Sequence, residues 1–371
     1  MTYTKDNPLR VVTLCSGYDS QCLALNRLRE KYPEFDYDLT AWAEFDPESK
    51  QPLNNQPAVR AHDALFPQWA DRNLGDMTKI DWTQVDDFDM LFYSTPCQSI
   101  SVSGLQHGFV EGSGTRSSII WNVRDAVKEK RPKFLCLENV KAMVSKKFLP
   151  LFNLWSQELE RLGYVNFTQV LNSKNYGVPQ NRERIFLVSI RQDALTELAD
   201  GAYHFPAPFT SSIRLKDIIE DKKPGLKDAR IMAMRGRNPD NPSDRKTHSN
   251  GRFKQRAEIG GYISNTLTSV SKDNFIVEIY EDAKYITTEG KQGIALPEEI
   301  KDEAVVIRDL TPRECFRLMD VSDTDIDKIQ QAGICVSRQC KMAGNSIVVN
   351  VLYHLFRKMF IETENESCSL F

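Results

Sequence analysis

The chain has 371 residues, 41% of them hydrophobic and 27% charged, which is typical of a globular protein with one large domain and a smaller one. It has no apolar run of about 18 residues, no apolar leader at its start, and no Cys pair at metal-binding spacing among its eight Cys. We therefore expect a cytoplasmic protein with reduced thiols, without a membrane span or a metal site, and the net charge of −3 excludes a surface that is basic throughout.

Short apolar runs alternate with helical patterns in the first half of the chain. The predicted strands are 10–15, 38–45, 89–95, 134–140 and 185–190, and the predicted helices are 21–31, 118–130 and 148–162. This alternation predicts an α/β fold, with a mostly parallel sheet that has helices on both faces. In such sheets ligands bind beyond the carboxyl ends of the strands, so the segments after each strand are the candidates for chemistry.

The first two predicted strands end in residues suited to a nucleotide-like ligand. Gly17 lies in a turn between a strand and a helix, where backbone N–H groups can meet an anionic group, although many such turns serve packing alone. Glu44 and Phe45 end the second strand. The carboxylate could accept hydrogen bonds from ribose hydroxyls and the ring could stack on adenine, or Glu44 could cap the helix that follows.

The third predicted strand delivers Cys97 directly after Pro96, ahead of the glycine-rich segment 99–116. A lone Cys is usually a small core residue. A Cys after a proline at a strand end is a poorer core candidate, so the segment favours a nucleophile. The glycines predict a loop that closes over a substrate.

The fourth and fifth predicted strands carry a carboxyl group and two guanidinium groups. Glu138 follows four apolar residues, and a buried carboxyl that holds a proton can donate it, although a structural ion pair is the alternative. Arg182 and Arg184 share one face of an extended segment. Together they could hold a carbonyl oxygen and favour a nearby thiolate, or form a solvated face.

The second half of the chain is less regular. Residues 206–256 are rich in Pro, Gly, Asn and Arg, and strand-like pieces follow at 262–270 and 275–280. Residues 229–256 contain eight Lys or Arg against two Asp, which indicates either a local site for nucleic acid or a solvated basic loop. Helical patterns return at 312–319 and in an apolar helix at 346–361.

Several of these motifs, in this order, resemble those of the cytosine-C5 methyltransferase family. They are Gly17, Glu44, Pro96-Cys97-Gln98, Glu138-Asn139-Val140, Gln180-x-Arg182-x-Arg184, Leu310–Cys315 and Gly344-Asn345-Ser346. The resemblance spans nearly the whole chain except the middle of 191–306, which is the variable target-recognition domain of that family. The chain departs from the family where Phe is usual at Cys15, and where Gly is usual at Asp19, Ser20 and Ser94.

The resemblance implies a Rossmann-like fold of SAM-dependent methyltransferases, where SAM is S-adenosylmethionine. It implies a catalytic domain at 1–192 plus 338–371, and a smaller, irregular, β-rich target-recognition domain with a hinge at 193–337. Cys97 would attack carbon 6 of a flipped cytosine, Glu138 would act at N3, and Arg182 and Arg184 would hold O2 and the Cys97 region.

The resemblance also assigns residues to the two substrates. The implied SAM site, which would release S-adenosylhomocysteine, comprises Gly17, Glu44, Phe45, Asp76, Met77, Pro96, Asn345 and Ser346. The implied contacts to double-stranded DNA are Gln98, Ser101, Arg235, Arg237, Arg252 and Thr266. No metal is implied.

The implied protein is a monomeric bacterial or phage enzyme at the nucleoid, either an orphan methylase or the partner of a restriction endonuclease that acts on the same site. Three alternative functions predict different sequence features. An amino-group methyltransferase would carry an Asp/Asn/Ser-Pro-Pro-aromatic motif in place of Pro-Cys-Gln. A tRNA-cytosine enzyme of the same family would carry Cys-Phe-Thr, which this sequence lacks. A binding module without catalysis would not need Cys97, Glu138 and the Arg pair.

Overall fold

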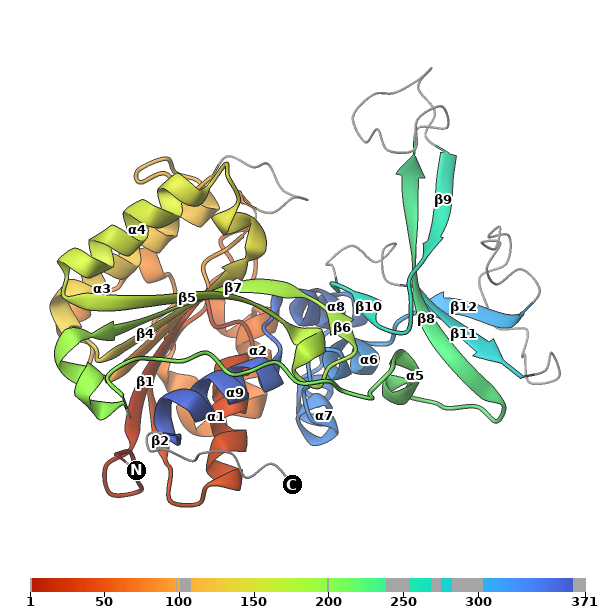
Figure 1. The fold of residues 1–371 in the computed structure, drawn as a ribbon, viewed down its shortest axis with the longest axis horizontal. Helices are drawn as coiled ribbons and strands as arrows, with labels where there is room; N and C mark the ends of the chain where they lie inside the picture. The colour runs from red at the N-terminus through yellow and green to blue at the C-terminus, as the bar shows by residue number, and fades with distance from the viewer. Residues whose placement is uncertain are drawn as a thin grey trace.

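The computed structural model describes residues 2–97, 99–100, 108–198, 200–237, 254–267, 275–281 and 303–362. Within these residues a six-stranded sheet with helices on both faces forms the larger body, and a four-stranded sheet stands to one side of it (Figure 1). Helices α6, α7 and α8 lie between the two sheets in this view.

The larger sheet has the strand order β2-β1-β3-β4-β7-β5. Its strands are β1 (Leu9–Leu14), β2 (Tyr37–Ala43), β3 (Met90–Tyr93), β4 (Phe134–Val140), β5 (Tyr164–Asn172) and β7 (Glu183–Arg191). Strand β7 runs antiparallel to both of its neighbours, and the other pairs are parallel. The predicted α/β fold with a mixed, mostly parallel sheet is therefore confirmed.

Successive side chains of the strands pack into two hydrophobic cores, one on each face of this sheet. Phe92 belongs to the core under α1 (Ser20–Lys31), α2 (Pro57–Leu65) and α9 (Val349–Phe360). Its neighbours Leu91 and Tyr93 belong to the core under α3 (Val123–Lys130) and α4 (Leu149–Arg161). The central strands β1, β3 and β4 are buried on both faces, which is why they read as nearly continuous apolar runs.

Two predicted helices begin several residues later than the sequence indicated. The helix predicted at 118–130 is α-helical only from Val123, because residues 116–122 form a 3-10 helix in which the hydroxyls of Ser117 and Ser118 bond to backbone carbonyls. The last helix, predicted from residue 346, begins at Val349, since Ser346 and Val348 have extended backbone.

The smaller sheet is antiparallel, in the order β12-β11-β8-β9. Its strands are β8 (Leu226–Arg237), β9 (Lys254–Ile259), β11 (Phe275–Tyr280) and β12 (Ala304–Asp309), and the short helix α5 (Leu215–Ile218) precedes it. The strand predicted at 275–280 is confirmed. Of the strand predicted at 262–270, the described part forms only β10 (Ser264–Asn265), which pairs with β6 (Gln180–Asn181), because residues 262 and 263 form a bend.

The chain returns to the larger body through α6 (Pro312–Arg317), α7 (Asp323–Gln331) and α8 (Val336–Asn345). Helix α6 begins with a capping box between Thr311 and Glu314, and α7 packs against α2. Arg308 on β12 bridges the buried carboxylates of Glu278 and Glu314, which ties the smaller sheet to α6. Among the helices of the described residues, none has the length and apolar character needed to cross a membrane.

Candidate active site

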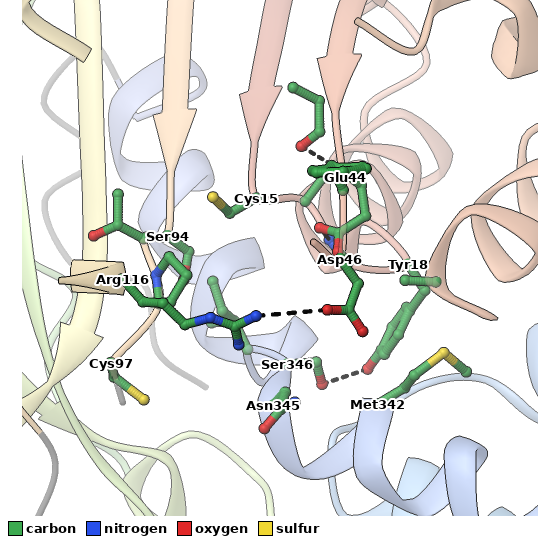
Figure 2. A pocket seen from close by; sticks show the side chains of 18 of the residues that line it. Cys15, Tyr18, Glu44, Asp46, Ser94, Cys97, Arg116, Met342, Asn345 and Ser346 are labelled. Carbon is green, nitrogen blue, oxygen red and sulfur yellow. Dashed lines mark hydrogen bonds and ion pairs between the residues drawn. The ribbon is translucent and has the colours of Figure 1, made fainter. Parts of the chain in front are cut away.

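A cavity of about 480 Å³ lies at the carboxyl ends of β1 to β4, beneath α8 (Figure 2). All of the residues that the sequence assigned to catalysis and to the cofactor line it. They are Cys97, Glu138, Arg182, Arg184, Gly17, Glu44, Phe45, Asp76, Met77, Pro96, Asn345 and Ser346. Its volume is within the range of small-molecule sites.

At one end of the cavity, Glu138 is nearly buried and has a different partner for each carboxyl oxygen. Its Oε1 lies 3.1 Å from Nε of Arg184, and its Oε2 accepts a hydrogen bond of 2.8 Å from the hydroxyl of Ser94. Strand pairing produces this arrangement, because Glu138 on β4 and Arg184 on β7 belong to adjacent antiparallel strands. A carboxylate held by a guanidinium and a hydroxyl has a fixed orientation.

Cys97 lies in the same part of the cavity as Glu138 and the two arginines. Burial raises the pKa of its thiol, the charge of Arg184 opposes that shift, Glu138 adds to it, and Arg182 opposes it. The thiol is therefore the resting form at neutral pH, and a thiolate here depends on the arginine charges.

The two arginines bind different partners, although the sequence predicted that they act together from one face of an extended segment. Arg182 is buried and donates to the backbone carbonyls of Gly344, near the end of α8, and of Ser346, which directly follows α8. Arg182 is the single residue between β6 and β7, whereas Arg184 lies on β7. Burial lowers the pKa of Arg182 to about 9, and the charge of Arg184 adds to this effect.

The turn after β1 is held against the end of β2. Gly17 has φ +60°, and its N–H donates to the Glu44 carboxyl at 2.9 Å. Burial raises the pKa of Glu44 to about 7, although the N–H of Gly17 opposes the shift. Glu44 does not cap the following helix, since the N-cap residue of α2 is Gln56.

Three other predicted cofactor residues line the cavity, and they differ in exposure and in hydrogen bonding. The ring of Phe45 is 38% exposed, which leaves a face available for stacking, and Met77 is buried. Asp76 caps a short turn by accepting from the backbone and hydroxyl of Thr78.

Sequence reasoning missed three contacts across this cavity. The hydroxyls of Tyr18 and Ser346 lie 2.6 Å apart, which joins the first turn to the segment before α9 (Figure 2). Arg116 pairs with Asp46 at 3.6 Å, and Ser94 bonds to Glu138. Each contact joins segments far apart in the sequence, so spacing along the chain gave no signal for it.

The predicted DNA contacts lie away from this cavity or outside the described residues. Gln98, Ser101 and Arg252 are outside the described residues. Arg235 and Arg237 lie on β8, where they pair in register with Arg256 and Lys254 of β9. The hydroxyl of Thr266 donates to the backbone carbonyl of Asn181, so it stabilises the join between β10 and β6.

Comparisons with known proteins agree with this picture. Residues 9–361 match the family model for C-5 cytosine-specific DNA methylase. Type II methyltransferase M2.ScrFI of Lactococcus lactis subsp. cremoris is 35% identical over 78% of this chain and 71% of its own length. Orphan methyltransferase M.SPRI of Bacillus phage SPR is 27% identical over 96% of this chain and 99% of its own.

Solved structures share the fold at low sequence identity. The methyltransferase EhMeth of Entamoeba histolytica has a TM-score of 0.63 at 13% identity and covers 96% of this chain and 99% of its own. The Dnmt2 methyltransferase of S. pombe has a TM-score of 0.55 at 17% identity, with 94% of this chain and 97% of its own covered.

Proposed function

The chain belongs to the C-5 cytosine-specific DNA methylase family, and we propose that it methylates cytosine in duplex DNA through a covalent bond between Cys97 and carbon 6 of the base. The observation that carries this proposal is the grouping of Cys97, Glu138 and Arg184 at one end of a cavity large enough for a nucleotide-like cofactor.

The chemistry explains why the family needs a nucleophile. Carbon 5 of cytosine is too weak a nucleophile to take a methyl group directly. Addition of the Cys97 thiolate forms a bond between sulfur and carbon 6, and the displaced electron pair moves towards N3, where Glu138 donates a proton. Carbon 5 is then nucleophilic. After methylation, a base removes the proton from carbon 5 and the bond between sulfur and carbon 6 breaks.

SAM, the methyl donor of this family, supplies an electrophilic methyl group when bound. The cavity suits it chemically. Glu44 offers a carboxylate to ribose hydroxyls, and the exposed ring of Phe45 offers a surface for adenine. We assign Asp76, Met77 and Pro96 to the adenosine side as well. Gly17, Asn345 and Ser346 would hold the methionine end, and the product would be S-adenosylhomocysteine.

The proposed DNA site comprises the basic strands β8 and β9 as the phosphate contacts and the glycine-rich segment 99–116 as the lid over a flipped cytosine. Residues 101–107 of that segment lie outside the described residues. Residues 193–337 would form the recognition domain and hinge, and 1–192 with 338–371 the catalytic domain. We propose that the protein acts as a monomer at the nucleoid on one specific sequence, as an orphan enzyme or with a cognate endonuclease. Its relatives include a type II methyltransferase and an orphan methyltransferase.

A trapping experiment tests the nucleophile. Duplex DNA with 5-fluorocytosine cannot release the enzyme after methylation, because carbon 5 carries fluorine in place of the proton that must leave. With SAM, the wild-type protein should form an adduct that survives denaturant, and Cys97→Ala should form none. The matched control is Cys335→Ala, because Cys335 is exposed and its pKa is lowered, first by the hydroxyl of Ser337. An adduct that persists in Cys97→Ala refutes the proposal.

A further inference from the structure

Ser94 stands at the carboxyl end of β3, three residues before Cys97, and lines the cavity (Figure 2). Its backbone N–H donates to the carbonyl of Leu14 on β1. Its hydroxyl donates to Oε2 of Glu138 at 2.8 Å. At this position the family usually has glycine, which has no side chain to make such a bond.

The hydroxyl makes the two oxygens of Glu138 unequal. Oε1 faces the Arg184 guanidinium at 3.1 Å, and a proton on that oxygen would be repelled by the positive charge. The proton that Glu138 donates therefore resides on Oε2, the oxygen beside Ser94. When the proton leaves, the hydroxyl of Ser94 donates to the new anion on the same oxygen.

We propose that Ser94 is a positioning residue that fixes the proton-donating oxygen of Glu138 and stabilises the carboxylate formed when Glu138 protonates the base. The inference rests on the proposed role of Glu138. It predicts that Ser94 contributes to the chemical step and leaves the binding of SAM and DNA unchanged.

The hydroxyl is not needed to hold the backbone of this segment. The N–H of Ser94 bonds to β1 whatever its side chain, and the Asn139 side chain holds the carbonyl of Thr95 at 3.0 Å. Substitution to alanine therefore removes one bond to Glu138 and keeps the others.

The test compares Ser94→Ala with Ser94→Thr, which restores a hydroxyl. Because a hydrogen bond to a charged group contributes substantially, its loss in Ser94→Ala should lower kcat about 10- to 100-fold. The KM values for SAM and DNA should stay within about twofold of wild type. Ser94→Thr should recover most of the rate. The control is Ser189→Ala on β7, a buried serine whose hydroxyl bonds to Asn166 away from the cavity, and it should keep wild-type kcat.

The split between kcat and KM gives a readout that a purely structural role would not produce. The hydroxyl of Ser94 stabilises charge that forms on Glu138 only when the proton leaves, so its removal should lower kcat and kcat/KM by the same factor. A rise in KM without a fall in kcat in Ser94→Ala refutes the inference, as does a fall in kcat that Ser94→Thr does not recover.

Glu138→Gln separates this inference from the proposed function. If that variant retains full kcat, the role of Glu138 is wrong and the inference fails with it. If it loses kcat while Ser94→Ala does not, only the inference fails. If both are right, adding Ser94→Ala to Glu138→Gln should cause little further loss, because the two residues act as one unit.

Discussion

Glu44 offers the sharpest test of how the cavity is built. Its negative charge should lower the stability of the folded chain but strengthen the binding of SAM. In the folded chain its pKa is about 7, raised from 4.5 mainly by burial. Below the unfolded value both states hold the proton. As pH rises towards 7 the unfolded chain releases the proton first, so folding stability falls, and above 7 the loss is complete. The difference corresponds to roughly 3 kcal/mol at most, and the true loss is smaller because Glu44 opens on the cavity.

Glu44→Gln removes the ionisation and keeps an amide oxygen to accept the N–H of Gly17. At about pH 8 the variant should be more stable than wild type, by up to roughly 3 kcal/mol, and near pH 4.5 the two should be equal. SAM binding should change in the other direction. A neutral amide is a weaker acceptor for ribose hydroxyls than a carboxylate, so the Kd should rise by about tenfold or more at pH 8.

Two measurements check this prediction: denaturant unfolding across the pH range and calorimetric titration with SAM. For wild type the Kd should rise as pH falls below 7 and level off once Glu44 is protonated, whereas for the variant it should be independent of pH. The control is Glu34→Gln, an exposed carboxylate ahead of β2, which should match wild type in both assays. A variant that is less stable at pH 8 and binds SAM normally would refute the reasoning.

Three further substitutions address other parts of the architecture. Gly17→Ala places a side chain at φ +60° with nothing within 4 Å of its Cβ, so about 1 to 2 kcal/mol of conformational strain should appear in denaturant unfolding, and an unchanged stability would contradict this. Arg308→Met leaves the carboxylates of Glu278 and Glu314 buried without a cation, which should lower the unfolding free energy by about 3 to 5 kcal/mol in the same assay, and a change under 1 would contradict it. Arg182→Lys removes a guanidinium that reaches the Leu267 carbonyl from Nη1 and the Gly344 and Ser346 carbonyls from Nη2, and one ammonium group cannot keep all three. Calorimetry should therefore show SAM binding weakened about tenfold, and an unchanged Kd would contradict this.

The sequence was informative where a strand is buried on both faces. The runs that became β1, β3 and β4 are nearly continuous in apolar residues, and the residues after them line the cavity as expected. Strand β5 was not predicted, because it carries polar residues such as Thr168 and Gln169 on its exposed positions. Its place at the edge of the sheet is set by pairing with β7, which local periodicity does not encode.

One departure from the family in the first turn, Asp19, has a structural reason. Asp19 stands where the family usually has glycine, with φ +65°, a conformation that Asp adopts more readily than most residues. Its buried carboxyl accepts from the hydroxyl of Thr13 and from the N–H of Cys22, so it caps α1. His62 lies 3.7 Å from the same carboxyl. The side chain thus supplies contacts that compensate for the unfavourable backbone, and none of these partners could be identified from spacing.

Arg184 links the two proton positions of the proposed mechanism. In the structure its charge is paired with Glu138, while burial keeps Cys97 as a thiol. The reactive form needs the reverse, a thiolate on Cys97 and a proton on Glu138. A proton that moves from the thiol to the carboxyl leaves the number of bound protons unchanged, so the ratio of the two forms does not depend on pH while the pair holds one proton. It also frees Arg184 from Glu138 to stabilise the thiolate, which Arg182, tied to backbone carbonyls, cannot do alone.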